Sequence, residues 1–124
     1  MSSNRTELED KVLLTKLTAF YGPLLTEKQR ECLSLWLEED YSLSEIAQEA
    51  GISRQGVHDT LHRGAMQLWQ LEDKLGLLDR FNRMEKGLEE IRSTLKDVEF
   101  PRKENTLLII DDLLRQEEEE GNGV

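Results

Sequence analysis

The chain has 124 residues, and 26 acidic against 16 basic side chains give it a formal net charge of −10. This length suits one domain with an appendage and leaves little room for a large catalytic cleft. No apolar run reaches the roughly 18 residues of a membrane span, the N-terminus lacks an apolar signal segment, and the single Cys32 excludes an internal disulfide. We therefore expect a cytoplasmic protein without membrane insertion. Its wealth of Leu, Glu, Gln and Lys predicts an all-α fold.

The first part of the chain predicts three short helices. The first spans residues 6–22, and the second begins after Thr26, which suits an N-cap. Ser42 and Glu45 form a capping box at the start of the third helix, and Gly51 suits its left-handed C-cap. Apolar residues at helical spacing are expected to pack in the first two helices: Leu8, Val12, Leu13, Leu17 and Phe20, then Cys32, Leu33, Trp36 and Leu37. Cys32 is expected to be a buried thiol and not a nucleophile.

A long helical stretch follows Ser53 and ends before Pro101. Gly76 is a weak point, at which this stretch either continues or divides into two helices. Apolar residues recur every three or four positions along it, near the coiled-coil repeat: Leu61, Ala65, Leu68, Leu71, Leu75, Leu78, Phe81, Met84, Leu88, Ile91, Leu95 and Val98.

The last predicted helix covers residues 104–118, with Leu107, Ile110 and Leu114 on one side. The apolar stripe before it is wide for a monomer with so few helices. Either this last helix folds back onto the stripe, or a second chain pairs with it, and we expect a homodimer. We divide the chain into a helix-turn-helix domain (1–75), a helical dimerisation arm with the C-terminal helix (76–116) and a disordered acidic tail (117–124).

Residues 42–61 fit a helix-turn-helix, because capping, small, turn and core residues all fall at the positions that this motif requires. Ala47 is small enough for close contact between the two helices, and Gly51 permits the turn. In the second helix, Arg54 has the side chain that pairs with guanine and Gln55 the one that pairs with adenine. Ser53 at the helix N-terminus suits a phosphate. The predicted DNA-binding residues are Ser53, Arg54, Gln55, His58, His62 and Arg63.

The segment "LTEKQRECLSLWLEEDYSLSEIAQEAGISRQGVHDTLHRGAMQLWQLEDKL" resembles region 4 of bacterial sigma factors. It is more closely similar to the YlxM-type family of small helix-turn-helix proteins, through "YSLSEIAQEAGISRQGVHD" and "LLTEKQR", over roughly residues 14–75. The resemblance implies an all-helical fold with a sigma region 4-like helix-turn-helix, dimers, and a regulatory role in the signal recognition particle pathway. It also implies DNA-facing positions at Ser53, Arg54, Gln55 and His58. Asp59, an acid on the DNA side, departs from the sigma pattern.

Acidic residues surround the motif more than they occupy it. Residues 26–74 hold five basic and ten acidic side chains, whereas residues 53–70 hold two basic and one acidic. Non-specific DNA affinity depends on neutralised phosphates, so two interpretations stay open. The first is a DNA-binding regulatory protein. The alternative is a protein-interaction module whose helix-turn-helix scaffold docks a basic partner, such as a component of the signal recognition particle.

His58 and His62 lie four residues apart, a spacing that can hold a metal ion. The segment "HDTLH" nevertheless lacks the glutamate of a metalloprotease motif, and two solvated histidines are the simpler interpretation. The sequence contains no glycine-rich phosphate loop, paired catalytic carboxylates or nucleophile motif. We therefore expect no enzymatic activity, no metal, no cofactor and no small-molecule substrate.

Overall fold

The computed structural model describes residue 8 and residues 10–122, with backbone only beyond residue 115. These residues form six α-helices, one short 3-10 helix and no strand, which confirms the all-α prediction. In chain order the elements are α1 (Lys11–Tyr21), η1 (Gly22–Leu24), α2 (Glu27–Leu37), α3 (Leu43–Ala50), α4 (Arg54–Leu75), α5 (Leu77–Leu95) and α6 (Lys103–Asn122).

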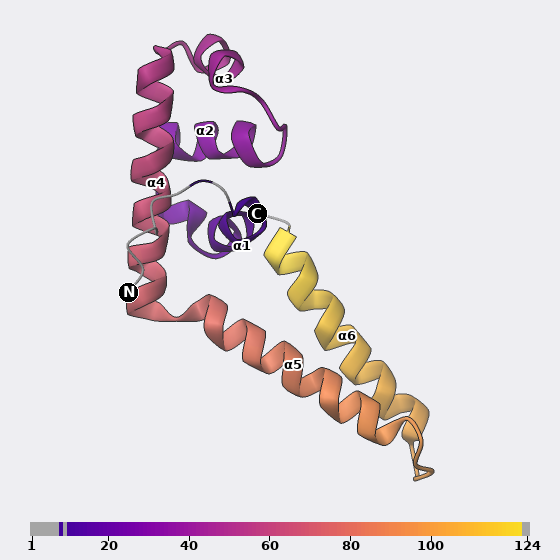
Figure 1. Cartoon of the computed structure of the whole chain (residues 1–124). Helices are drawn as coiled ribbons and strands as arrows, with labels where there is room; N and C mark the ends of the chain where they lie inside the picture. The colour runs from indigo at the N-terminus through magenta and orange to yellow at the C-terminus, as the bar shows by residue number, and fades with distance from the viewer. Residues whose placement is uncertain (1–7, 9, 123–124) are drawn as a thin grey trace.

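The long helix α4 is the axis of the molecule (Figure 1). Helices α1, α2 and α3 pack beside it at successive levels, with α3 at the end where α4 begins. At its other end the chain turns into α5, which leaves at an angle, and α6 returns alongside α5 toward α1. We call α5 and α6 together the arm hairpin. The helix-turn-helix and the tip of the arm hairpin therefore lie at opposite ends of the molecule.

The core lies where α1, α2 and α3 meet α4. Gly64 lets α2 approach closely, because a Cβ atom there would lie 3.1 Å from Cδ1 of Leu33. Cys32 is fully buried, as predicted, and burial raises the pKa of its thiol. The core consists of Leu14, Leu17, Tyr21, Leu25, Cys32, Leu33, Ile46, Val57, Leu61, Ala65, Leu68 and Leu78.

One predicted core residue of the first helix is wrong. Val12 is 69% exposed, and Leu14 is buried in its place. The helix begins at Lys11, where the Asp10 side chain accepts a hydrogen bond from the Leu13 N–H at 3.0 Å. Leu14 and Leu17 then share the helix face that meets α4, while Val12 lies outside that face.

The long helical stretch divides at Gly76, whose φ of 64° and ψ of 27° are left-handed. This division splits the predicted apolar stripe. Its α4 part is mostly buried, whereas Leu75 is 55% exposed and Met84, Ile91 and Val98 are each about half exposed. The turn redirects the chain, so the stripe does not follow one continuous helix face.

The last helix folds back onto the stripe within the same chain. Ile110 is buried, and Leu107 and Leu114 are half-buried, so the predicted apolar side faces its neighbours. Arg92 of α5 donates from Nε to Oδ1 of Asp111 at 2.6 Å, which ties the two helices together. The helical backbone continues to Asn122, into the segment where we expected a disordered tail, because glutamate is a good helix former. Residues 123–124 of that tail lie outside the described residues.

Within the described ranges, no helix is long and apolar enough to cross a membrane.

Candidate nucleic-acid interface

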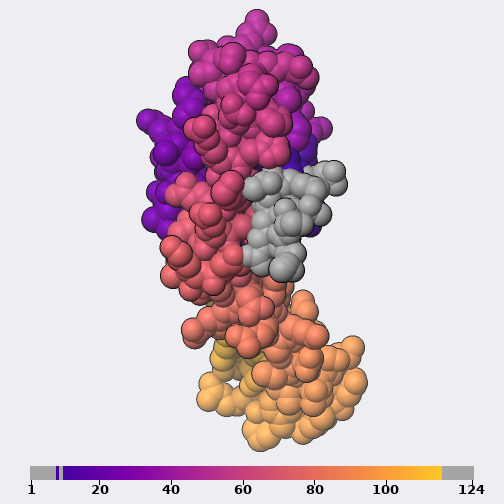
Figure 2. Space-filling model, turned by 60° about the vertical axis from the view of Figure 1, so that its left-hand side comes forward, coloured from indigo at the N-terminus to yellow at the C-terminus, as the bar shows by residue number. Residues whose placement is uncertain are grey.

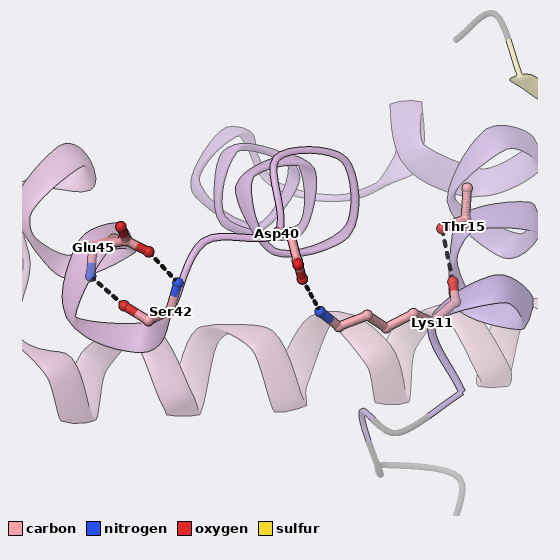
Figure 3. Close-up of polar contacts among 5 residues, drawn as sticks. All are labelled: Lys11, Thr15, Asp40, Ser42 and Glu45. Carbon is pink, nitrogen blue, oxygen red and sulfur yellow. Dashed lines mark hydrogen bonds and ion pairs between the residues drawn. The ribbon is translucent and has the colours of Figure 1, made fainter.

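Helix α3, the first helix of the motif, begins at the predicted capping box (Figure 3). The Ser42 hydroxyl accepts a hydrogen bond from the Glu45 N–H at 3.1 Å, and the Ser42 N–H donates to Glu45 Oε1 at 2.7 Å. Both partners satisfy backbone groups that the helix itself leaves unpaired. The sequence therefore fixes where α3 begins without help from distant residues.

The turn between α3 and α4 is set by Gly51, which has a left-handed φ of 72°. The N–H groups of Gly51 and Ile52 both donate to the Ala47 carbonyl, at 3.0 and 3.2 Å. Ser53 then caps α4 by accepting from the Gly56 N–H at 2.9 Å. A Cβ atom at Gly56 would lie only 3.1 Å from the Ser53 hydroxyl, so glycine leaves room for this cap. From the sequence, Gly56 stands out only as a departure from the sigma region 4 pattern, which often has a long side chain there. Its role in the cap depends on its position three residues after Ser53.

Contacts from other helices hold the motif in place. Lys11 of α1 donates to Asp40, just before α3, at 2.8 Å (Figure 3). Its ammonium also lies 4.3 Å from the ring centroid of Trp36. Lys28 of α2 donates to the Ala50 carbonyl at 3.1 Å, which places a cation at the carboxyl end of α3. Lys28 is thus engaged in holding α3, although its charge also suits a phosphate contact.

The six predicted DNA-binding residues lie at the N-cap and in the first three turns of α4. Ile46, Val57 and Leu61 are fully buried and orient the opposite, polar side of α4 toward solvent. Five of the six predicted residues are exposed and one is half-buried: Ser53, Arg54, Gln55, His58 and Arg63 are exposed, and His62 is half-buried. The structure therefore brings the whole set to one end of one helix.

An acidic side chain lies within this polar surface. The Gln55 amide donates to Oδ1 of Asp59 at 3.0 Å, and Nδ1 of His58 lies 3.5 Å from the same oxygen. The hydrogen bond from Gln55, followed by the one from His58, lowers the pKa of Asp59 below its ordinary value. Asp59 is therefore a stable anion, and one N–H of the Gln55 amide is already engaged by it. Sequence reasoning noted the acid but missed this bond, which the four-residue spacing of the pair permits.

The two histidines contact each other, with ring centroids 4.3 Å apart and planes inclined by 40°. In the part of the chain that the structure describes, no three His, Cys, Asp or Glu residues are grouped so that they could hold a metal ion. The two imidazole rings therefore contact each other side by side on the polar face of α4.

An open groove of about 410 Å³ continues from Arg63 along the side of α4 that faces α2. Arg63 and Lys74 lie at its two ends along α4, and neither forms an ion pair with any residue in the described ranges. The groove is lined by Gln29, Arg63, Met66, Gln67, Gln70, Leu71 and Lys74. The groove therefore holds two basic side chains, while Glu72 and Asp73 directly precede Lys74 in α4.

Comparison with known proteins gives one family. A family model described as "Putative helix-turn-helix protein, YlxM / p13 like" matches residues 8–108. A UPF0122 protein of Thermoanaerobacter sp. (strain X514) is 42% identical over 118 residues, which cover 90% of this chain and 96% of that protein. A UPF0122 protein of Acetivibrio thermocellus is 46% identical over 84 residues, covering 68% of this chain and 72% of the relative. A UPF0122 protein of Geobacillus kaustophilus is 41% identical over 85 residues, covering 68% and 77%.

Proposed function

Because the chain belongs to the YlxM/p13-like family of helix-turn-helix proteins, we propose that it is a DNA-binding regulatory protein that inserts the first turns of α4 into the major groove. One observation carries this proposal: a turn at Gly51 and a side-chain cap at Ser53 project an exposed polar face from the start of α4. Recognition helices present base-contacting residues at that end. Such a role belongs in the cytoplasm.

Each predicted side chain has a chemical role at that end of α4. Arg54 pairs with O6 and N7 of a guanine, and Gln55 with N6 and N7 of an adenine. Ser53, at the positive end of the helix dipole, donates a hydrogen bond from its hydroxyl to a nearby phosphate. His58, His62 and Arg63 contact the backbone and groove wall further along. These contacts follow the ordinary division between base reading and phosphate positioning.

Asp59 makes DNA binding conditional. One N–H of the Gln55 amide donates to the Asp59 carboxylate at 3.0 Å, so an adenine must be read by the other N–H and the carbonyl oxygen. That carboxylate also repels nearby phosphates. Binding to arbitrary DNA is therefore weak, and only a sequence that satisfies Arg54 and Gln55 offsets this repulsion. An acidic protein can thus read DNA by base contacts while avoiding non-specific phosphate binding.

The protein acts as a homodimer in this proposal, with residues 1–75 reading DNA and residues 76–116 pairing two chains. The support is an apolar row, along α5 and just beyond its end at Leu95, that the described residues of one chain leave uncovered. Its members recur every seven residues, the repeat of a coiled-coil seam, and each is 41–49% exposed: Leu77, Met84, Ile91 and Val98. On α6, Leu108, Ile109 and Leu113 are 41–65% exposed. Large apolar side chains in such number on one hairpin are unusual for a monomer.

The test is binding to DNA selected from a random library. Replacing Arg54 and Gln55 together by alanine should abolish the preference for the selected sequence over random DNA. The matched control is Arg80→Ala, which removes an exposed arginine from α5, far from the interface. It should bind nearly as the wild-type chain does. A double variant that retains the full sequence preference would contradict the proposal.

A second candidate function is the docking of a basic protein or ribonucleoprotein partner. The observation that favours it is an exposed acidic cluster at the end of α2, formed by Glu38, Glu39 and Asp40. By the resemblance stated above, the partner would be a component of the signal recognition particle. Glu38→Lys together with Glu39→Lys should then weaken the complex, whereas Arg54→Ala should leave it unchanged. An effect of Arg54→Ala alone would exclude this alternative.

A further inference from the structure

The junction between α4 and α5 lacks a cap of its own. Gly76 closes α4 by donating its N–H to the Glu72 carbonyl at 2.8 Å, and it also stands directly before α5. Because the N-cap residue is a glycine, it has no side chain that could accept a hydrogen bond from the first turn of α5. The first N–H groups of a helix have no partners inside it, so those of α5 need acceptors from elsewhere.

These acceptors come from two other helices. The Glu72 carboxylate, on the last turn of α4, accepts from the Leu78 and Asp79 N–H groups, both at 3.0 Å. The Tyr21 hydroxyl, from the end of α1, accepts from the Leu77 N–H at 3.0 Å. The same hydroxyl donates to Glu72 Oε1 at 2.6 Å. One connected set of hydrogen bonds therefore ties α1, α4 and α5 at a single point.

Burial keeps this set in its bonded form. Tyr21 is fully buried, and desolvation, followed by its hydrogen bond with Glu72, raises the pKa of the phenol to about 12. The hydroxyl thus keeps the proton that it donates. Apolar packing supports the same junction, since Leu78 is buried and the rings of Phe20 and Phe81 meet edge to face at 5.5 Å.

The angle at Gly76 has large consequences further along the molecule. Helix α5 has 19 residues and is about 28 Å long, so a tilt of about 10° displaces its far end by roughly 5 Å. Figure 2 shows the arm hairpin extending from the body formed by the other helices. If two chains pair through this hairpin, its angle decides how far apart the two recognition helices lie.

We propose that Tyr21 and Glu72 are positioning residues that hold the arm hairpin at a fixed angle to α4, and so determine the spacing between the two DNA half-sites that a dimer accepts. The spacing depends on the proposed DNA-binding dimer. The angle itself does not, and it can be measured in the free protein.

The angle is tested by electron paramagnetic resonance distances between spin labels at Gln48 on α3 and Glu90 on α5, both exposed. Labelled chains are diluted with unlabelled ones so that distances between subunits do not contribute. Tyr21→Phe, which keeps the ring and removes the hydroxyl, should at least double the width of the distance distribution. Glu72→Ala should do the same, and Tyr41→Phe is the matched tyrosine control that should not. Unchanged widths in a folded Tyr21→Phe protein would overturn the proposal, even if Glu72→Ala did not fold.

The spacing is tested with paired half-sites separated by varied numbers of base pairs. The wild-type protein should bind one spacing at least tenfold better than spacings one or two base pairs away. Tyr21→Phe should reduce this preference to within about threefold, while its affinity for a single half-site is unchanged. A spacing preference that survives a broadened hinge would overturn the link to spacing. A wild-type protein that selects no DNA would instead contradict the proposed function, and the distance measurement would then decide the hinge alone.

Discussion

Two left-handed glycines divide the chain, and their surroundings differ. Gly51 (φ 72°) and Gly76 (φ 64°) each end one helix and lead into another. After Gly51, the next helix is capped locally by Ser53, only two residues further on. After Gly76, the next helix is capped by Glu72 from the preceding helix and by Tyr21, whose hydroxyl is supplied from 56 residues before Leu77. A locally capped turn keeps its geometry wherever it is placed, whereas the second junction depends on the packed core.

The largest expected effect comes from removing the carboxylate that caps α5 and binds the Tyr21 hydroxyl. Glu72→Ala leaves the Leu78 and Asp79 N–H groups and the Tyr21 hydroxyl without their acceptor, and should lower the free energy of unfolding by about 2–3 kcal/mol. Glu45→Ala, in the local capping box of α3, is the matched control and should cost about 1 kcal/mol. Urea unfolding measures both. Equal losses would show that the two junctions do not differ as described.

The glycines themselves should behave alike. A Cβ atom at Gly51 or Gly76 would meet no atom within 4 Å, so alanine at either position is strained only through its positive φ. Each substitution should cost about 1–2 kcal/mol in unfolding free energy. Thermal or urea unfolding of the two variants checks this expectation. A loss at Gly76 far above that at Gly51 would mean that the hinge backbone is also under steric constraint.

Alkaline pH should affect only the second junction. The pKa of Tyr21 is about 12 in the folded protein, against 10.0 for an ordinary tyrosine. Its stabilising effect is therefore fully present below pH 10, and is lost as the pH rises toward 12, because only the unfolded chain releases the proton in this range. Unfolding free energies at pH 9 and 11 should differ less in Tyr21→Phe than in the wild-type protein. An identical pH dependence in both would contradict this assignment.

The smallest effect on stability is expected from a substitution at Asp59, which should nevertheless increase the affinity for DNA. This carboxylate is exposed on the proposed DNA-binding face of α4, so Asp59→Asn should change the unfolding free energy by less than about 0.5 kcal/mol. It should raise affinity for any DNA several-fold, because a phosphate-repelling charge is removed and Gln55 is less firmly engaged. Fluorescence anisotropy with selected and random duplexes measures the change. Weaker binding by Asp59→Asn would show that the acid itself contacts the DNA.

The same difference between local and distant contacts explains what could be predicted from the sequence. The capping box at Ser42, the turn at Gly51 and the cap at Ser53 use residues within a few positions of one another, and all three predictions are confirmed. The sequence alone did not decide whether the helix divides at Gly76, because the groups that stabilise the division include Tyr21, which is far away in the chain. The prediction that Val12 packs in the core was wrong for a related reason, since helical spacing alone cannot decide which of two adjacent helix faces meets α4.

The predicted interface residues show the same limit. Their exposure at the start of α4 follows from the spacing of the buried Val57 and Leu61, so the sequence alone could predict that they lie together. The hydrogen bond from Gln55 to Asp59 depends on side-chain conformation, which periodicity does not specify. What the residues bind stays a prediction.

Methylation interference on the selected DNA tests most directly whether the start of α4 reads the major groove. The guanine N7 atom lies in that groove and is one of the two acceptors that Arg54 would use. Methylation of particular guanines should prevent binding of the wild-type protein, in two clusters related by the symmetry of a dimer, and should not affect residual binding by Arg54→Ala. Binding that tolerates methylation at every guanine would contradict insertion of Arg54 into the major groove.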